Sequence, residues 1–209
     1  MIERKFIAEK LKEYRIQEFI SETLKNVGHS HTKLMRTPLG EKIIIYASRP
    51  GLVVGRKGEN IKKLTNTLKK KFELENPQIE IAEVGNPNLD AQIVAERIAS
   101  TIERFGINKF KAIGHKTMQD VINAGALGIE IIISGKVPSQ RAKSWRFYSG
   151  YLKKAGNIAL EGVTKAKAVC IMKTGAIGVK VSIMGAQTKM PDDLEVTKPK
   201  AETPEEKKP

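Results

Sequence analysis

The sequence contains a single cysteine and no long apolar run, and each absence excludes a class of protein. Cys170 has no second cysteine with which to form an intrachain disulfide, which is typical of proteins of the reducing cytosol. No apolar segment approaches the roughly 18 residues that span a bilayer. The first residues alternate between charged and apolar types and lack the hydrophobic region of a signal peptide. We therefore expect a cytoplasmic protein without a membrane partner.

The chain also has few residues that could support catalysis or hold a metal. His29 and His31 lie close together, but no cysteine or further histidine is near enough in the sequence to complete a tetrahedral zinc site. The Gly-x-x-x-x-Gly-Lys-Ser/Thr pattern of a nucleotide-binding phosphate loop does not occur. Cys170 lies in an apolar segment, and we interpret it as a small buried hydrophobe rather than a nucleophile. These observations predict no catalytic residue, no metal and no cofactor.

Negative charge is scarce relative to positive charge. The 37 Lys and Arg residues outnumber 23 Asp and Glu residues, which gives a formal net charge of +14. A chain this basic usually binds nucleic acid or an anionic membrane surface. Residues 1–106 have 19 basic and 14 acidic residues, residues 107–190 have 14 and 3, and residues 191–209 have 4 and 6. The middle segment, with a net charge of +11, is therefore the strongest candidate for a nucleic-acid surface.

Helices and strands alternate in the first half of the chain. Apolar residues at helical spacing predict a helix over residues 3–27, which Gly28 can end. Two strands are expected next, joined by a turn at Pro38-Leu39-Gly40. The order helix, strand, strand, helix, strand is that of a type II KH domain. The expected elements after the first helix are strands at 31–36 and 42–48, a short helix at 51–54, a helix at 61–72, a strand at 78–84 and a helix at 89–105.

The second half predicts a separate domain. We place the domain boundary at Gly106-Ile107-Asn108, which gives domains of residues 1–106 and 107–185. The segment 186–209 is rich in Pro, Lys and Glu, and it is predicted to be a disordered tail. The second domain is expected to contain a helix at 109–124, a strand at 128–134, and two further strands near 166–172 and 178–184 with a hairpin turn at 176–178.

The segment Gly55-Arg56-Lys57-Gly58 lies between an apolar segment and a strongly helix-forming one. Glycine lets the backbone approach another molecule closely because it has no Cβ. Two cations between the glycines favour a phosphate backbone as that molecule. The pattern alone also fits an ordinary turn before a helix, but its flanking elements favour the KH-type loop, which clamps about four nucleotides. Lys62 and Lys63 on the following helix complete the RNA contacts predicted here.

Two further basic segments lie in the second half. The helix predicted at 109–124 opens with Lys109, Lys111 and Lys116, although cations at a helix start oppose the helix dipole. Residues 134–147 interleave four cations with aromatic and hydroxyl side chains, a composition suited to phosphates. Trp145 in this segment, the only tryptophan, is interpreted as a core or interface anchor rather than a base-stacking residue. The predicted RNA contacts of residues 134–147 are Lys136, Arg141, Lys143 and Arg146.

Several of these segments resemble one known family, the ribosomal protein S3 family of the small ribosomal subunit. Gln140-Arg141-Ala142-Lys143-Ser144 is similar to its archaeal and eukaryotic branch rather than to the bacterial one. The resemblance extends over about residues 1–185, and it therefore includes both predicted domains. The segments that carry it are residues 47–61, 79–84 and 89–91 in the KH segment, and residues 126–131, 134–136 and 175–181 in the C-terminal domain.

The resemblance implies an α+β protein, in which an N-terminal type II KH domain precedes a second α/β sandwich domain with a mostly antiparallel sheet. It also implies a structural constituent of the subunit head that binds ribosomal RNA, contacts neighbouring ribosomal proteins and lines the mRNA entry site. The family's basic entry helix falls on residues 109–116. Ala112 and His115 occupy positions where the bacterial branch has stronger cations, so Lys111 and Lys116 are the preferred mRNA contacts.

Two other classes of function stay open at this point. A nucleic-acid-processing enzyme, such as an abasic-site lyase or a nuclease, could use one of the many lysines to form a Schiff base with a sugar aldehyde. A free KH regulator of mRNA would bind through its first domain alone. We prefer the ribosomal role because the charge excess lies in residues 107–190 and the resemblance includes both halves of the chain.

Overall fold

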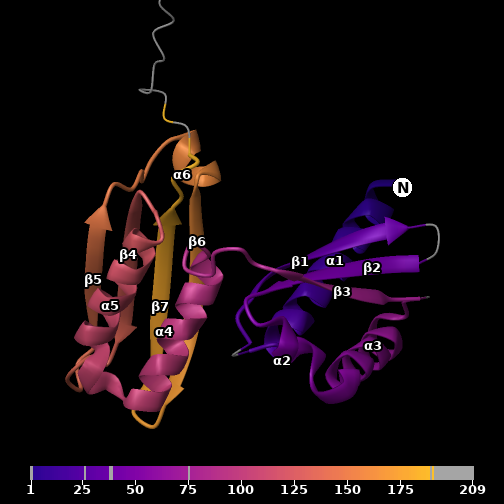
Figure 1. The fold of residues 1–209 in the computed structure, drawn as a ribbon, viewed down its shortest axis with the longest axis horizontal. Helices are drawn as coiled ribbons and strands as arrows, with labels where there is room; N and C mark the ends of the chain where they lie inside the picture. The colour runs from indigo at the N-terminus through magenta and orange to yellow at the C-terminus, as the bar shows by residue number, and fades with distance from the viewer. Residues whose placement is uncertain (1, 26, 38–39, 75, 189, 191–209) are drawn as a thin grey trace, which may run out of the picture.

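The computed structural model describes residues 2–25, 27–37, 40–74, 76–188 and 190. The chain forms two bodies, joined by the segment between β3 (Gln78–Glu83) and α4 (Ala91–Phe105) (Figure 1). Pro38 and Leu39 of the predicted turn lie outside the described residues, as does nearly all of the tail predicted at residues 186–209.

The first body places three strands against helices. Its sheet has the order β1-β2-β3, in which β2 is antiparallel to β1 and parallel to β3. A parallel pair needs a crossover connection, which α2 and α3 supply. Besides β3, the elements are α1 (Ile2–Thr23), β1 (His29–Thr37), β2 (Gly40–Ala47), α2 (Pro50–Val54), a single 3₁₀ turn (Arg56–Gly58) and α3 (Glu59–Phe72).

The core of the first body lies on one face of this sheet. Ile43 and Ile45 of β2 are fully buried, and they lie opposite Ile79 and Ile81 of β3. Apolar side chains at alternate strand positions point to the same face, so this register gathers them into one layer. The helices contribute Ile16, Ile20, Val53, Leu64 and Leu68 to the same cluster.

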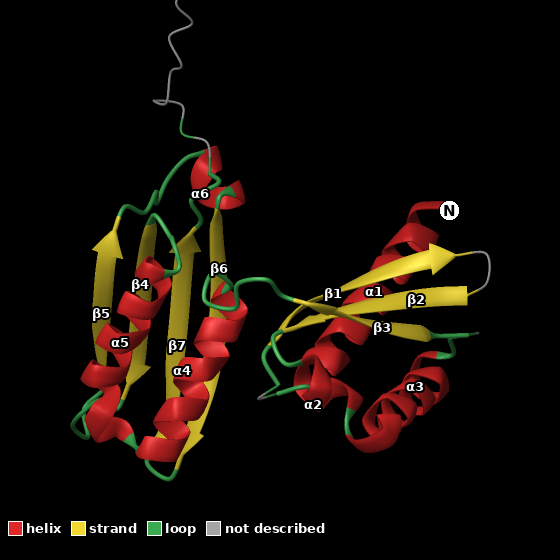
Figure 2. Cartoon of the chain, in the orientation of Figure 1, coloured by secondary structure: helices red, strands yellow, loops and turns green. Residues whose placement is uncertain are grey.

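The second body is a four-stranded antiparallel sheet with two helices on one face (Figure 2). The strand order is β5-β4-β7-β6, and α4 and α5 pack together against one layer of buried strand residues. The elements after α4 are a 3₁₀ turn (Ile107–Lys109), α5 (Phe110–Asn123), β4 (Gly128–Gly135), β5 (Lys143–Gly150), α6 (Asn157–Glu161), β6 (Val163–Met172) and β7 (Gly175–Met184).

A glycine allows α5 to approach the sheet closely. A Cβ built on Gly114 would lie 2.9 Å from ring atoms of Phe147 in β5. Real Cβ atoms do not approach other atoms so closely, so a larger residue here would push α5 away from β5.

The predicted fold class is confirmed, but several details differ from the expectations. The strand β5 was not expected, and the hairpin between β6 and β7 turns at Lys173 and Thr174 rather than at residues 176–178. The boundary predicted at Gly106 does not coincide with the division between the two cores. The helix α4, which precedes that boundary, buries its apolar face in the second core, so the cores divide between Glu83 and Ala91.

Candidate nucleic-acid interface

The loop Gly55–Gly58 holds its two cations outward through unusual backbone angles. Gly55, Lys57 and Gly58 have φ values of 72°, 54° and 75°. Such angles are uncommon for a residue with a side chain, so the conformation of Lys57 is strained and points to a functional loop. Arg56 and Lys57 are both exposed.

The two glycines of the loop have different surroundings. A Cβ on Gly55 would lie 2.5 Å from Nδ2 of Asn60, so the start of α3 leaves no room for a side chain. A Cβ on Gly58 would meet no described atom within 4 Å, and this side of the loop is therefore open to an approaching molecule. The amide of Gly55 donates to the carbonyl of Gly51 in α2, and the amides of Gly58 and Glu59 donate to the carbonyls of Gly55 and Arg56. Phosphate contacts would therefore depend largely on the side chains of Arg56 and Lys57.

The two lysines predicted on α3 differ in their availability. Lys63 Nζ lies 2.5 Å from Oε1 of Glu59 in an exposed ion pair. The hydrogen bond from Lys63 lowers the pKa of the Glu59 carboxyl, and the charge of Lys63 adds to this effect. Lys62 is exposed, with no ion pair to another residue in the described part of the chain. Lys62 is therefore more available than Lys63 to an external phosphate.

Two basic segments of the second body meet at one end of its sheet. Lys111 Nζ, at the start of α5, lies 5.0 Å from the ring centre of Trp145 in β5. Trp145 Nε1 donates a 3.0 Å hydrogen bond to the carbonyl of Val137, which fixes the connection between β4 and β5. We call this region the basic end and define it by five exposed cations: Lys109, Lys111, Lys136, Arg141 and Lys143.

Trp145 itself packs in the core, which is one of the two anchor roles expected for it. Its ring is 5.3 Å from that of Phe110, centre to centre, and it packs against the second core. Lys109 Nζ lies 5.4 Å from the ring centre of Phe105, so both lysines at the start of α5 contact aromatic faces. These contacts orient the lysines while leaving them exposed.

Two of the predicted cations lie away from the basic end. Lys116 is exposed farther along α5. Arg146 points to the opposite side of the sheet from Trp145 and forms an ion pair with Glu130 of β4. Three lysines of β6 and β7 that the sequence did not single out share that side with Arg146: Lys165, Lys167 and Lys180.

The residues considered for catalysis or metal binding are engaged in the fold. Burial raises the pKa of the Cys170 thiol to about 11, and the nearby charge of Glu103 adds to that rise. His29 is buried against Thr32, and the His31 ring stacks 4.3 Å from that of Tyr46. Within the described ranges, no group of three potential ligands could hold a metal ion. None of the helices described is long and apolar enough to cross a bilayer.

Comparison with known proteins matches each body to a family. Residues 15–89 match the family described as KH domain, and residues 98–183 match the one described as "Ribosomal protein S3, C-terminal domain".

Most of the chain is similar to proteins named "Small ribosomal subunit protein uS3" in several organisms. The relative in Methanocaldococcus jannaschii is 45% identical over 194 residues, which are 93% of this chain and 92% of the relative. The relative in Methanobrevibacter smithii is 40% identical over 97% of this chain and 80% of its own length. The relative in Halobacterium salinarum is 42% identical over 93% of this chain and 64% of its own length. The predicted resemblance and its archaeal character are both confirmed.

Proposed function

Because the chain belongs to the uS3 family of small ribosomal subunit proteins, we propose that it is a structural constituent of the small subunit. It binds ribosomal RNA in the subunit head and lines the mRNA entry site. Its other partners are neighbouring ribosomal proteins, and it acts in cytoplasmic ribosomes rather than as an enzyme. The names of the relatives support the ribosomal role.

The basic end is the observation that carries the RNA-binding part of this proposal. Its five cations come from two segments that are separate in the sequence and are brought together by the contacts of Trp145. Lysine and arginine bind nucleic acid by neutralising phosphates and releasing counterions. Lys111 and Lys116 are the proposed mRNA contacts, and the cations of the connection between β4 and β5 are proposed to contact ribosomal RNA.

The Gly55–Gly58 loop is proposed as a second RNA contact, with Arg56 and Lys57 on phosphates. The strained backbone and the open space beside Gly58 support this role. Lys62 adds a third cation on the helix that follows the loop, whereas the ion pair with Glu59 reduces the contribution of Lys63.

Charge reversal in the full chain tests both contacts separately. The variants Arg56→Asp/Lys57→Asp and Lys136→Asp/Arg141→Asp should each weaken binding of a single-stranded oligouridylate by roughly tenfold or more. The slope of log affinity against log salt should fall by about 0.7 for each phosphate that the variant no longer neutralises. Fluorescence anisotropy over a salt series measures both quantities.

The control variant Arg4→Asp/Lys5→Asp changes the charge equally in two exposed residues of α1. It should weaken binding much less than either test variant. Unchanged affinity of Arg56→Asp/Lys57→Asp, with an intact circular dichroism spectrum, would refute the loop contact alone. If the wild-type chain binds RNA without salt dependence, or does not co-sediment with small subunits, the proposed function is wrong.

A further inference from the structure

One face of the second sheet is not covered by α4 or α5. The buried strand residues under these helices occupy alternate positions, so the residues between them point the other way. The short helix α6 and its neighbours close only one end of this second face, through Leu152, Val163 and Met184. The side chains of the open part are Ser144, Arg146 and Tyr148 of β5, Glu130, Ile132 and Ser134 of β4, Lys180 and Ser182 of β7, and Lys165, Lys167, Val169 and Ile171 of β6.

The strand register aligns cations in a row across this face. Arg146 lies opposite Ile132, Ile132 lies opposite Lys180, and Lys180 lies opposite Lys167. With neighbouring strands about 4.8 Å apart, the row extends about 14 Å across the sheet. Lys165 follows on β6, about 7 Å along the strand from Lys167. We call these four cations, together with Lys154, the basic sheet face.

Among the described residues of this face, the one carboxylate, that of Glu130, is already paired with two cations. Glu130 accepts hydrogen bonds from Arg146 and, at 3.1 Å, from Lys154. Burial, the largest influence on the pKa of the Glu130 carboxyl, raises it, but the two cations together outweigh burial and lower the pKa. Glu130 therefore stays ionised, and it forms ion pairs with both Arg146 and Lys154.

The three lysines of β6 and β7 have no such partner. Lys165, Lys167 and Lys180 are exposed, and none forms an ion pair with another residue in the ranges that the structure describes. Lys167 and Lys180 are directly opposite one another, an arrangement of like charges that destabilises a sheet. An anionic partner bound across the two strands would remove this repulsion.

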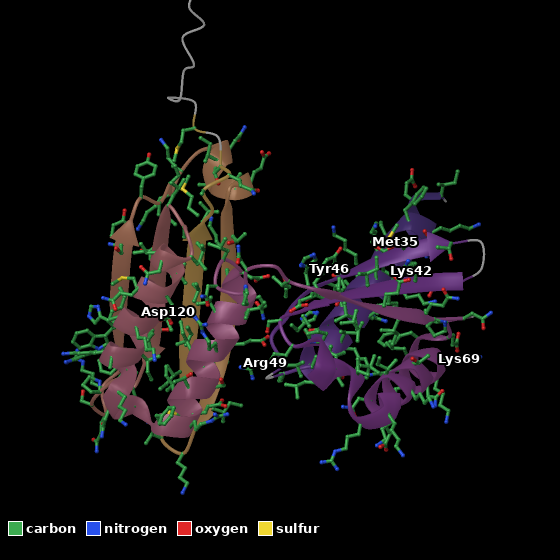
Figure 3. All side chains as sticks on the ribbon, viewed as in Figure 1. Met35, Lys42, Tyr46, Arg49, Lys69 and Asp120 are labelled. Carbon is green, nitrogen blue, oxygen red and sulfur yellow. The ribbon has the colours of Figure 1, made fainter. Side chains whose placement is uncertain are left out.

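The open face of the first sheet provides a contrast within the same molecule. There Lys42 forms a 2.7 Å ion pair with Glu80, and Lys33 lies 5.5 Å from the ring centre of Tyr46. Lys42 and Tyr46 are labelled on this sheet in Figure 3. Its cations are thus balanced or packed locally, whereas the lysines of the second sheet are not.

We infer that the basic sheet face binds the sugar–phosphate backbone of folded ribosomal RNA. This inference rests on the proposed function and adds a contact surface to the basic end. Phosphates match the three unpaired lysines of this face, and the face offers little for base recognition. Its aromatic residue, Tyr148, lies on β5 with the Arg146 guanidinium 5.0 Å from its ring centre. The contact is therefore independent of RNA sequence.

Removing the three unpaired lysines from the full chain tests the inference. The variant Lys165→Gln/Lys167→Gln/Lys180→Gln should bind a short RNA duplex of random sequence roughly one to two orders of magnitude more weakly at low salt. The slope of log affinity against log salt, measured between about 50 and 200 mM, should fall by about 0.9 for each phosphate that the variant no longer neutralises. The midpoint of thermal unfolding should stay the same or rise, because the repulsion between Lys167 and Lys180 is removed.

Two controls separate the contact of these lysines from general charge effects and from a contact made by the exposed apolar residues of the same face. The variant Arg4→Gln/Lys5→Gln/Lys12→Gln removes the same formal charge from α1 and should retain most of the duplex affinity. The variant Val169→Ser/Ile171→Ser removes exposed apolar surface from the same face without changing its charge, and it should bind the duplex as the wild type does.

The outcomes distinguish this inference from the proposed function. If the wild type binds RNA and the triple lysine variant binds the duplex equally well, the inference is wrong and the proposed function stands. A decrease in affinity equal to that of the α1 control also overturns the inference. A larger loss of duplex affinity in Val169→Ser/Ile171→Ser than in the triple lysine variant would also overturn the inference, because the contact would then not depend on the cations. If the wild type binds no RNA, the proposed function fails first.

Discussion

At the scale of single residues, His29 is a titratable group that the fold keeps neutral. Its side chain lies at the start of β1, is 4% exposed, and has Nε2 2.8 Å from Oγ1 of Thr32. Burial lowers the pKa of His29, the neighbouring charge of His31 lowers it further, and Asp90 opposes both. Protonation of His29 therefore favours the unfolded chain.

This environment predicts a loss of stability in mild acid. The unfolded chain has the ordinary histidine pKa of about 6.5, so it takes up a proton before the folded chain does as the pH falls. The contribution of neutral His29 is fully present above that value and declines as the pH falls toward the lower pKa of the folded state. The urea midpoint of the wild type should therefore fall between about pH 7.5 and about pH 5.5, and that of His29→Gln should fall less.

An exposed histidine provides the matched control. His115 lies on α5 with its ring 5.2 Å from that of Phe147, centre to centre, and it is exposed. The variant His115→Gln should show the same response to pH as the wild type. An equal acid response of His29→Gln and the wild type would contradict the role assigned to His29.

Some residues of the candidate interface could be predicted from the sequence, but their partners could not. Residue type identified Arg141, Trp145 and Arg146, and it favoured an anchor role for Trp145 without showing whether that role is in the core or at an interface. The partner of Arg146 could not be predicted, because its ion pair with Glu130 depends on the register between β5 and β4. Register also decides which lysines of β6 share a face with Arg146.

At the scale of elements, α4 begins where the chain passes from the first body to the second. Asp90 caps this helix, since its Oδ1 accepts a 2.9 Å hydrogen bond from the amide of Gln92. Its other carboxylate oxygen accepts a hydrogen bond from the hydroxyl of Ser30 in β1. One side chain therefore starts a helix and also links the two bodies.

Asp90→Ala should destabilise the chain by about 1 kcal/mol because the helix is no longer capped. Asp90→Asn should cost less, because asparagine is also a strong capping residue. Urea unfolding followed by far-ultraviolet circular dichroism measures both. Equal stability of the alanine variant and the wild type would show that the cap contributes nothing here.

The elements missed or misplaced have physical explanations. In β5, Trp145 and Phe147 point toward the helices. The alternate positions on the open face of the sheet are polar, charged or tyrosine residues, namely Ser144, Arg146 and Tyr148. The signal of a buried strand is therefore weak. The hairpin turn was predicted at residues 176–178, whereas Gly178 lies within β7, where a Cβ would be 3.1 Å from Oγ of Ser134.

At the scale of the whole molecule, the sequence predicted two bodies but not the division between their cores. The apolar stripe of α4 was visible in the sequence, and nothing in its periodicity showed which sheet it covers. A glycine that follows a helix is a reasonable boundary signal, and Gly106 indeed ends α4 with a positive φ. The packing partner of a helix is a tertiary property, which a local pattern does not contain.

The division between the cores predicts how fragments of the chain will behave. The helix α4 buries six side chains in the second core: Ala91, Val94, Ala95, Ile98, Ala99 and Ile102. A fragment of residues 85–209 retains this layer and should unfold cooperatively, as circular dichroism during heating would show. A fragment of residues 107–209 exposes the sheet surface under α4. Because burial of each large aliphatic side chain contributes about 1.5–3 kcal/mol and a domain is stable by only about 5–15 kcal/mol, this shorter fragment should not fold. Cooperative unfolding of the shorter fragment at the same temperature would place α4 outside the second domain.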